Sequence, residues 1–563
     1  MYILGIWDGH DSGAAIVREN KILVAINEER ISRRKLDITF PEKSIQACLE
    51  YLGLSPPDIT YIAISTFDFA KTLSRLLPNL KEEYYQIRRR KKNPGLLKSF
   101  KKISKYKLTE FGPSNLTKSI SHAILKNKLE KLGFGLSKVY LIDHHQCHAA
   151  TAAFCSGFDE CAVITLDGIG DGLSGSISLL RNNKLTLIET ISGKSSLGVF
   201  FEHITNLLNM RELEDEGKVM ALANYSYPIK DSENPLLNFF FIEGINIKAK
   251  YGPIRMYREL KKILWRLPSE QFAYCAQRTL ETKISELVKN IMLKTGQNRI
   301  ALAGGIFSNI KVNMCLSKLS MVSDCFIFPH MGDGGLALGA ALMVNNELKG
   351  VSSYPLNNIF LGPDFSEEQI KSALDLSGLE YKYYENIEQE AARIIAEKNI
   401  VFWFQGRMEY GPRALGNRSI LAKPDSQKIR DLLNLKLKMR VWYQPFCPTM
   451  LEEEAKNYLI GYKSPNLFMT MAYMVKDDKK DDIKGILGVD GSCRPQIIQG
   501  NESLFGRLLQ NLKKITGKGV ALNTSFNIHG EPLVCSPQDA INTFKKCGSN
   551  YLVMGNYLAR NRK

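Results

Sequence analysis

Three histidines within five residues are the first feature of this sequence that could do chemistry. His144, His145 and His148 lie in the segment HHQCHAA, in a chain that contains eight histidines in all. If the segment is helical, His144 and His148 stand four residues apart on one face and could bind one metal ion together. The alternative is that Asp143 caps the helix and the histidines are only packed in the core. The spacing leaves both interpretations open.

Two aspartates beside glycines could complete such a metal site. Asp167 follows the apolar strand expected over Ala162–Leu166, and Asp333 lies in the segment MGDGG at another expected strand end. Imidazole and carboxylate groups together suit Fe, Zn, Mn or Ni, so the cofactor that these residues indicate is a divalent metal ion.

Two glycine-rich loops are candidate nucleotide sites. Gly304, Gly305 and Asn309 follow the apolar strand Ile300–Leu302, and Gly332 opens a second loop before an apolar helix. Glycines let the backbone approach a ligand, and the N-terminus of the next helix attracts phosphate. Neither loop matches the Walker A or the dinucleotide-binding pattern, and glycine turns before helices are common, so a plain turn is the alternative.

The second half of the chain combines cations with hydroxyl and amide groups. The candidate residues are Arg413, Lys438, Arg494, Ser525 and Asn527. Guanidinium, ammonium and hydroxyl groups are the donors that a small phosphorylated substrate needs. The alternative is that the arginines cap loops and pair with the acidic run 452–454. The known serine-nucleophile motifs are missing from the sequence, which favours the positioning of two bound reactants over an acyl-enzyme.

The elements that must position these residues alternate between strands and helices, which predicts an α/β fold. Ile6–Ala15 and Thr165–Ile177 share one pattern, in which an apolar strand is followed by an Asp-Gly turn and a second apolar strand. This repeated pattern predicts a duplicated nucleotide-binding fold, although Asp-Gly is also a common hairpin turn. A linker-like stretch over Val351–Leu361 places the main domain boundary near residue 355.

Composition excludes several classes of protein. The chain has 563 residues, of which 44% are hydrophobic and 24% charged, so it is neither disordered nor fibrous. It lacks an apolar run of about 18 residues and a recognisable signal peptide, so we expect a cytoplasmic location. Eleven cysteines without a C-x-x-C pair indicate reduced thiols rather than disulfides or a zinc ribbon.

The formal net charge of +17 is concentrated in one stretch. Residues 71–110 contain thirteen basic and three acidic side chains, with Arg88–Lys92 at the centre. This basic stretch could face an anionic acceptor, an acidic partner or a membrane surface, and a plain solvated helix is the alternative. Because the rest of the chain is nearly balanced, a nucleic-acid partner is not expected.

Nine motifs together resemble the O-carbamoyltransferases of nodulation and antibiotic biosynthesis, almost from end to end. They are HDSGAAIV, EERISRRK, HHQCHAA, DEGKVMALA, LAGGIFSN, MGDGG, EYGPRALGNRSILA, RPQ and NTSFNIHGEP. The resemblance implies that residues 1–352 form a duplicated actin-like domain of the ASKHA, threonylcarbamoyl-transferase-like type, with a basic helical insertion at about 69–132. It implies that residues 353–563 form a YrdC-like α/β domain.

The resemblance also implies an activity. Carbamoyl phosphate and Mg-ATP would give a carbamoyl-adenylate in the C-terminal domain. The N-terminal domain would then transfer the carbamoyl group to a hydroxyl of a sugar or natural product. The alternative is a tRNA-modifying threonylcarbamoyl transferase. The second half of the chain argues against this alternative, because its GPRALGNRS motif resembles a carbamoyl phosphate site. A homodimer is an oligomeric state that the sequence leaves open.

Carried over residue by residue, the family pattern assigns roles to the candidate residues. His144, His148, Asp167 and Asp333 would bind the metal, with Fe²⁺ as the expected ion. His10 would take part in the transfer step. Arg413 and Lys438 would act in catalysis and bind substrate, and Arg494, Ser525 and Asn527 would bind substrate only. The nucleotide would be bound by Gly304, Gly305, Asn309 and Gly332. The chain departs from the family pattern at Leu36, Val441, Gln444 and Asn550.

Overall fold

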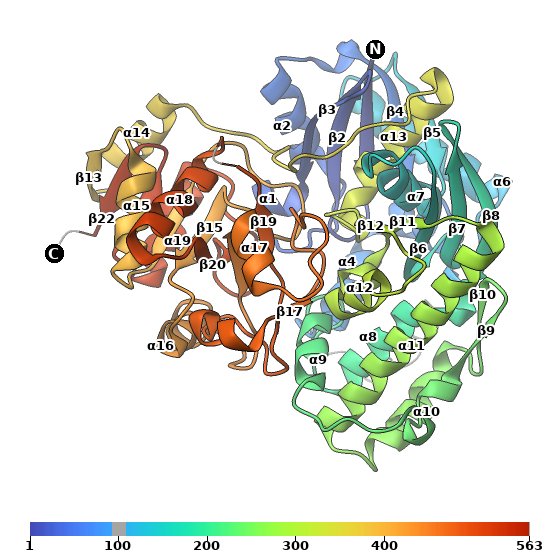
Figure 1. Ribbon diagram of the computed structural model, residues 1–563. Coiled ribbons are helices and arrows are strands. Elements are labelled where there is room, and N and C mark those ends of the chain that lie inside the picture. The colour runs from blue at the N-terminus through green and yellow to red at the C-terminus, as the bar shows by residue number, and fades with distance from the viewer. Residues whose placement is uncertain (93–107, 501, 562–563) are drawn as a thin grey trace. The chain divides into compact units, whose positions relative to one another are not determined.

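The computed structural model describes residues 1–92, 108–500 and 502–561 (Figure 1). Its internal contacts divide the chain into two units, of which the first comprises Met1–Glu28 and Asp37–Leu356. The second comprises Glu29–Leu36 and Asn357–Lys563. Both units combine β-sheets with helices, which confirms the expected mixed α/β fold.

The first unit contains two five-stranded sheets with the same topology. In the first sheet the strand order is β3-β2-β1-β4-β5, and in the second it is β8-β7-β6-β11-β12. The first three strands of each sheet form an antiparallel meander, and the last two run parallel to the meander's first strand. This repeated order is the duplication that the two Asp-Gly segments predict, because they form the β1–β2 and β6–β7 connections.

The strands of the two sheets have the following bounds. They are β1 (Tyr2–Trp7), β2 (Gly13–Arg18), β3 (Lys21–Asn27), β4 (Ile59–Ser65), β5 (Lys138–Ile142), β6 (Cys161–Gly170), β7 (Leu173–Arg181), β8 (Lys184–Ser192), β11 (Arg299–Ala303) and β12 (Asp324–Ile327). A separate ribbon pairs β9 (Phe240–Glu243) with β10 (Asn246–Ala249).

Two buried helices join the sheets. Helix α13 (Leu336–Lys349) packs against β1, β2 and β4, whereas α7 (His144–Cys155) packs against β6, β7 and β11, and the two helices contact each other. Glycines allow α13 to pack closely against both β1 and α7. A Cβ atom on Gly5 would lie 1.9 Å from the Ala337 carbonyl oxygen, and one on Gly339 would lie 2.1 Å from the Cys147 carbonyl oxygen.

The remaining helices of the first unit surround this core. They are α2 (Glu42–Leu52), α3 (Phe69–Leu76), α4 (Pro78–Arg88), α6 (Asn115–Lys131), α8 (Leu197–Leu207), α9 (Glu216–Ala223), α10 (Pro253–Leu264), α11 (Ser269–Thr295) and α12 (Ile310–Ser317). Helices α3, α4 and α6 belong to the expected basic insertion, of which residues 93–107 lie outside the described part. Among the described helices, none combines the length and apolar character needed to span a bilayer.

The second unit is built on one mixed eight-stranded sheet with the order β13-β22-β21-β14-β15-β20-β16-β19. Its strands are β13 (Glu380–Tyr383), β14 (Val401–Phe404), β15 (Arg418–Ala422), β16 (Cys447–Leu451), β19 (Gln496–Ile498), β20 (Val520–Ser525), β21 (Tyr551–Met554) and β22 (Tyr557–Arg560). A short pair, β17 (Tyr473–Met474) and β18 (Ser492–Cys493), lies apart from it. The YrdC-like assignment of this unit stays a prediction.

Six α-helices lie among the described residues of 357–561 in the second unit. They are α14 (Glu367–Asp375), α15 (Ile387–Ala396), α16 (Gln427–Asp431), α17 (Glu452–Tyr458), α18 (Leu504–Thr516) and α19 (Pro537–Cys547). Of these, α15, α17, α18 and α19 contact the large sheet. Helices α15 and α18 pack together on a core that includes Trp403, Leu508 and Val553.

The second unit includes a segment that the expected boundaries assign to residues 1–352. Glu29–Leu36, which overlaps α1 (Glu28–Ser32), is counted with the C-terminal part. Hydrogen bonds connect this segment to the second unit. Arg30 donates to the Gly411 carbonyl oxygen at 2.6 Å, and Arg33 donates to the Leu533 carbonyl oxygen at 2.6 Å. Two arginines of the EERISRRK motif therefore fasten this segment to loops of the second unit.

Candidate functional site

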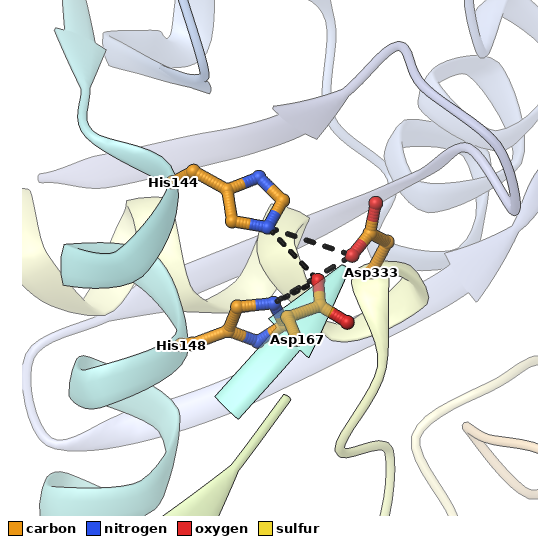
Figure 2. A group of neighbouring side chains, drawn as sticks. All are labelled: His144, His148, Asp167 and Asp333. Atoms are coloured by element: carbon orange, nitrogen blue, oxygen red, sulfur yellow. Dashed lines mark hydrogen bonds and ion pairs between the residues drawn. The ribbon is translucent and has the colours of Figure 1, made fainter. Parts of the chain in front are cut away.

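Four side chains of the first unit converge on one point (Figure 2). The Nε2 atom of His144 lies 3.2 Å from Oδ2 of Asp167 and 3.6 Å from Oδ1 of Asp333. The Nε2 atom of His148 lies 3.5 Å and 3.6 Å from the same two oxygens. One nitrogen or oxygen from each residue thus lies within 4.8 Å of all the others. The structure brings together the four residues that the sequence proposes as metal ligands.

Local structure explains this convergence. Asp143 caps α7 by accepting hydrogen bonds from the backbone N–H groups of His145 and Gln146. The capped helix then presents His144 and His148 on one face, so the expected cap is present, and the metal site stays a prediction. Asp167 comes from β6, and Asp333 comes from the short turn that leads into α13.

Neighbouring groups orient two of the four side chains. Thr66 Oγ1 lies 3.1 Å from Nδ1 of His144, and the Gly305 N–H donates to Oδ1 of Asp167 at 2.9 Å. His145 faces elsewhere, since its ring nitrogens contact Thr165 Oγ1 and the Leu173 carbonyl oxygen. Burial lowers the pKa of His145 to about 3, so this ring is neutral and structural.

The electrostatics of the cluster favour a bound cation. Burial lowers the pKa of His144, but the carboxylates of Asp333 and Asp167 outweigh it and raise that pKa to about 9. The pKa of His148 is also raised, because Asp167 and Asp333 outweigh its burial. Burial raises the pKa of Asp167, whereas the two imidazoles hold it well below its usual range. Two buried carboxylates therefore require positive charge, which imidazolium protons or a metal ion can supply.

The donor set fits a divalent metal ion. His148 Nε2 is buried and makes no hydrogen bond with any described residue, although it points at both carboxylates. Two imidazole nitrogens and two carboxylate oxygens are ligands of Fe²⁺, Zn²⁺ and Mn²⁺. Thr66 would hold the hydrogen on Nδ1 of His144, which leaves Nε2 as the ligand atom.

His10 lies beside this cluster. Its Nδ1 atom is 3.2 Å from Oδ2 of Asp333, and its carbonyl oxygen accepts a hydrogen bond from the Trp7 indole. The ring lies near that of Tyr85 on α4, with 5.8 Å between the centroids. The first unit thus places the candidate transfer residue next to the candidate metal ligands.

The basic insertion holds the loop that carries His10. Asp8 accepts two hydrogen bonds from Arg75, at 2.8 and 3.0 Å. It also forms an ion pair with Lys71, at 2.8 Å. Burial raises the pKa of Asp8, but Arg75 and Lys71 outweigh it and keep that pKa well below its usual range. Lys81 donates to the backbone carbonyl oxygen of Asp8.

Farther along the same insertion, Arg88 pairs with Glu202 and with Glu212, and Arg89 pairs with Glu214. These arginines are mostly buried against the acidic residues of the first unit. The described part of the basic stretch is therefore divided, because Arg88 and Arg89 meet acidic partners within the chain itself, whereas Arg90, Lys91 and Lys92 are exposed. The outer partner expected for this stretch stays a prediction.

The loop that holds Gly304 and Gly305 has a structural role that the sequence does not reveal. Gly304 has φ +102°, and a Cβ atom there would lie 2.2 Å from the Leu166 carbonyl oxygen. A Cβ atom on Gly305 would lie 2.7 Å from Oδ1 of Asp167. Asn309 caps α12 and exchanges two hydrogen bonds with Gln277. Gly304 and Gly305 therefore allow the loop to pack against β6. The nucleotide contacts expected of this loop stay a prediction.

Replacing Gly304 by alanine should therefore destabilise the first unit. Because the left-handed backbone and the clash with Leu166 add up, we expect a loss of about 3 kcal/mol in the free energy of unfolding. Urea denaturation of the full chain measures it. Gly332→Ala is the matched control, because Gly332 has a negative φ and a Cβ atom there would meet no atom within 4 Å. Equal stability of the two variants would contradict this account of the loop.

In the second unit, three arginines gather without a carboxylate. Arg494 donates from Nε and Nη2 to Sγ of Cys447, at 3.1 and 2.9 Å. Burial, and then the neighbouring Arg494, lower the pKa of Arg413 to about 9. The guanidinium group of Arg440 stacks over Phe446 at 4.1 Å. Among the described residues, none of the three guanidinium groups has an ion pair with an acid. Such a cluster needs an anion.

Lys438 is buried in the same unit and holds a turn together. Its Nζ atom donates to the carbonyl oxygens of Ser525 and Asn527, at 2.5 and 2.8 Å, and to Oδ1 of Asn527 at 2.7 Å. Burial and then Arg440 keep the pKa of Lys438 well below its usual range. The structure thus brings Lys438, Ser525 and Asn527 together, as the candidate substrate-binding set requires.

Sequence reasoning missed Glu409, which shapes the loop of the GPRALGNRS motif. Its buried Oε1 accepts hydrogen bonds from the backbone N–H groups of Leu415, Asn417 and Arg418, at 2.8 to 3.0 Å. The loop so fixed carries Arg413. The available signal was the acid directly before the Tyr-Gly-Pro turn, which offers a carboxylate to unpaired backbone donors.

Glu216 gives the first unit a pH-dependent stability. Its carboxylate accepts a hydrogen bond from the Leu213 N–H, yet burial raises its pKa to about 8. Between the usual carboxyl pKa and pH 8 the folded state binds more protons than the unfolded state, so stability falls as pH rises through this window. Glu216→Gln should remove that decline, as thermal unfolding at pH 5 and pH 8 would show. An unchanged pH dependence would contradict the assignment.

Comparison with known families gives matches over most of the chain. A family model described as Carbamoyltransferase N-terminus matches residues 2–342, and one described as Carbamoyltransferase C-terminus matches residues 392–561. The uncharacterized protein MJ1051 of Methanocaldococcus jannaschii is 32% identical, over 99% of each chain. Nodulation protein NolNO of Sinorhizobium fredii is 31% identical, over 98% of this chain and 79% of that protein.

Solved structures show more distant likeness. Component A of the (R)-2-hydroxyglutaryl-CoA dehydratase of Acidaminococcus fermentans has a TM-score of 0.35 at 14% identity, over 61% of this chain and 97% of that one. Full-length HypF, in a phosphate- and nucleotide-bound form, has a TM-score of 0.33 at 14% identity, over 62% of this chain and 56% of that one. At these scores the solved structures carry no argument about the site.

Proposed function

The chain belongs to the carbamoyltransferase family, and from this premise we propose that it is an ATP-dependent O-carbamoyltransferase. The proposed carbamoyl donor is carbamoyl phosphate, and the proposed acceptor is a hydroxyl group of a sugar or natural product. A carbamoyl-adenylate links the two. The observation that carries this proposal is the arginine cluster without a carboxylate in the second unit, together with the His/Asp cluster in the first.

The second unit is proposed to make the adenylate. Carbamoyl phosphate loses its phosphate to water, and the carbamate oxygen then attacks the α-phosphorus of Mg-ATP, with pyrophosphate as the leaving group. These reactants carry several negative charges, which Arg413 and Arg494 can neutralise because no acid among the described residues competes for them. Lys438 fixes the turn that presents Ser525 and Asn527.

The first unit is proposed to transfer the carbamoyl group. The acceptor hydroxyl attacks the carbamoyl carbon, AMP leaves, and His10 takes the hydroxyl proton. The contact between His10 Nδ1 and Asp333 orients the ring for this task. The clamp of Arg75 and Lys71 on Asp8 keeps the loop in place. The duplicated sheet topology supports the actin-like assignment of this unit.

A divalent metal ion, expected to be Fe²⁺, is proposed to bind to His144, His148, Asp167 and Asp333. When bound, such an ion supplies Lewis-acid stabilisation of the negative charge that develops at the carbamoyl oxygen. The four residues supply two neutral nitrogens and two carboxylates, and Thr66 and Gly305 orient His144 and Asp167.

Mass spectrometry tests the acceptor class. The purified chain, reconstituted with Fe²⁺, would be incubated with carbamoyl phosphate, Mg-ATP and pools of sugars, secondary metabolites or tRNA. We expect a product heavier by one carbamoyl group in a hydroxyl-bearing small-molecule pool. Modification of tRNA alone would overturn the proposed acceptor class in favour of an RNA substrate.

A further inference from the structure

One buried amide of the first unit contacts both loops that carry the proposed transfer residues. Asn27, the last residue of β3, is only 2% exposed. Its Nδ2 atom donates to the Asp11 carbonyl oxygen at 3.2 Å and to the Gly334 carbonyl oxygen at 3.3 Å. Asp11 directly follows His10, and Gly334 directly follows Asp333. A single side chain thus connects the backbone next to two residues whose side chains lie 3.2 Å apart.

The neighbours of this amide determine its orientation. Carbonyl oxygens can only accept hydrogen bonds, so the Nδ2 end of Asn27 must face the two loops, and its Oδ1 end then faces the ring of His330. The Nε2 atom of His330 lies 2.9 Å from that oxygen and therefore carries a hydrogen. The same Nε2 atom lies 3.7 Å from Oδ2 of Asp11. His330 thereby keeps the amide from turning around.

The two loops are packed tightly around this amide. A Cβ atom on Gly334 would lie 2.3 Å from Oδ2 of Asp11 and 2.3 Å from the nearest ring atoms of His330. Gly13 pairs with Asn27 across β2 and β3, and a Cβ atom on Gly13 would lie 3.3 Å from Nδ2 of Asn27. Asp11 has φ +56°, a left-handed backbone that costs free energy and persists only where its surroundings hold it. The hydrogen bond from Asn27 to its carbonyl oxygen is one such restraint.

We propose that Asn27 is a positioning residue for carbamoyl transfer, because its amide holds the loop of His10 and the turn of Asp333 at one fixed spacing. This inference rests on the proposed function for the roles of His10 and Asp333, whereas the bridge between their loops is a property of the fold. Asn27 acts through these two residues and not by contact with the substrate. It keeps the proposed proton acceptor against the proposed metal ligand, so its loss should impair both the metal site and the transfer step.

Asn27→Leu removes the bridge with little change of side-chain size, because leucine has neither the donor nor the acceptor of the amide. In the full chain without metal, amide hydrogen exchange followed by mass spectrometry should then become about tenfold faster in both residues 8–13 and residues 331–335. The two segments lie more than 300 positions apart in the sequence, and Asn27 lies within neither. This measurement needs no substrate and no metal ion, so it tests the bridge whatever the reaction proves to be.

Asn234→Leu is the matched control for the exchange experiment. Asn234 is also buried, but it donates from Nδ2 to the Cys275 carbonyl oxygen of α11 rather than to either loop. Its replacement should leave exchange in both loops unchanged. Asn27→Asp is a second variant, which keeps the acceptor for His330 but turns an oxygen toward the two carbonyl oxygens, so it should also open both loops. Unchanged exchange of the loops in both Asn27 variants would overturn the inference.

Metal binding and kinetics separate positioning from a general loss of stability. Relative to Asn234→Leu, Asn27→Leu should weaken Fe²⁺ binding and lower the kcat of transfer, each by about tenfold or more. The KM for carbamoyl phosphate and the release of pyrophosphate should stay unchanged, because the second unit makes the adenylate. Equal Fe²⁺ affinity and equal transfer in the two variants would overturn the positioning role. If the unchanged chain neither binds Fe²⁺ nor transfers a carbamoyl group, the proposed function fails, and hydrogen exchange alone decides whether the bridge stands.

Discussion

Replacing both His144 and His148 by alanine is expected to abolish metal binding and, with it, carbamoyl transfer. The two imidazoles supply half of the proposed ligands, and their removal leaves Asp167 and Asp333 as two buried carboxylates without a partner cation. Bound iron, measured by mass spectrometry of the reconstituted protein, should fall from about one equivalent per chain to background. Transfer should fall by about 10²-fold or more, because Lewis-acid stabilisation is worth several kcal/mol.

The control for this experiment is His122→Ala, a substitution on α6 that leaves the cluster untouched. It should keep both the metal content and the transfer rate. Pyrophosphate release in the second unit should survive the double substitution, because that step does not use these residues. Transfer at an unchanged rate by the metal-free double variant would contradict the role assigned to the cluster.

Replacing Arg413 by alanine should have the second largest effect. Its buried guanidinium group lies beside Arg494 and Cys447, and no described acid pairs with it, so it can neutralise a bound anion. A charge-assisted bidentate contact to a phosphate or carboxylate is worth about 1.5–3 kcal/mol, so pyrophosphate release should fall by about 10- to 100-fold. A colorimetric pyrophosphate assay with carbamoyl phosphate and Mg-ATP measures it.

Arg393→Ala is the matched control for this variant. Arg393 lies half-exposed on α15, where Glu390 and Glu397 neutralise it. Its removal should leave pyrophosphate release unchanged. If Arg413→Ala released pyrophosphate as fast as the Arg393 variant, the arginine cluster would not be the adenylation site.

The candidate metal ligands show what a sequence can reveal. His144 and His148 were predictable because a helix repeats every 3.6 residues, and Asp143 marked where that helix begins. Asp167 and Asp333 were predictable as acids at strand ends beside glycines. The repeated Asp-Gly segments predicted the duplicated sheets, because a repeated local pattern survives in the sequence. Each of these signals is local or periodic.

Other parts of the site depend on contacts between distant residues, which leave no local signal. Cys447 meets Arg494 across 47 positions of the chain, and Arg33 meets Leu533 across 500. A charge count finds the basic stretch but cannot show that Arg88, within it, meets Glu202 and Glu212. The structural role of Gly304 leaves no signal in the sequence, since only the fold shows that Leu166 lies against it.

The nucleotide product of the reaction tests the central claim most directly. The full chain would be incubated with carbamoyl phosphate and ATP labelled at the α-phosphate, and the labelled products separated by chromatography. The proposed carbamoyl-adenylate route predicts labelled AMP and one pyrophosphate for each carbamoyl phosphate consumed. Labelled ADP, or consumption of carbamoyl phosphate without any ATP turnover, would contradict it.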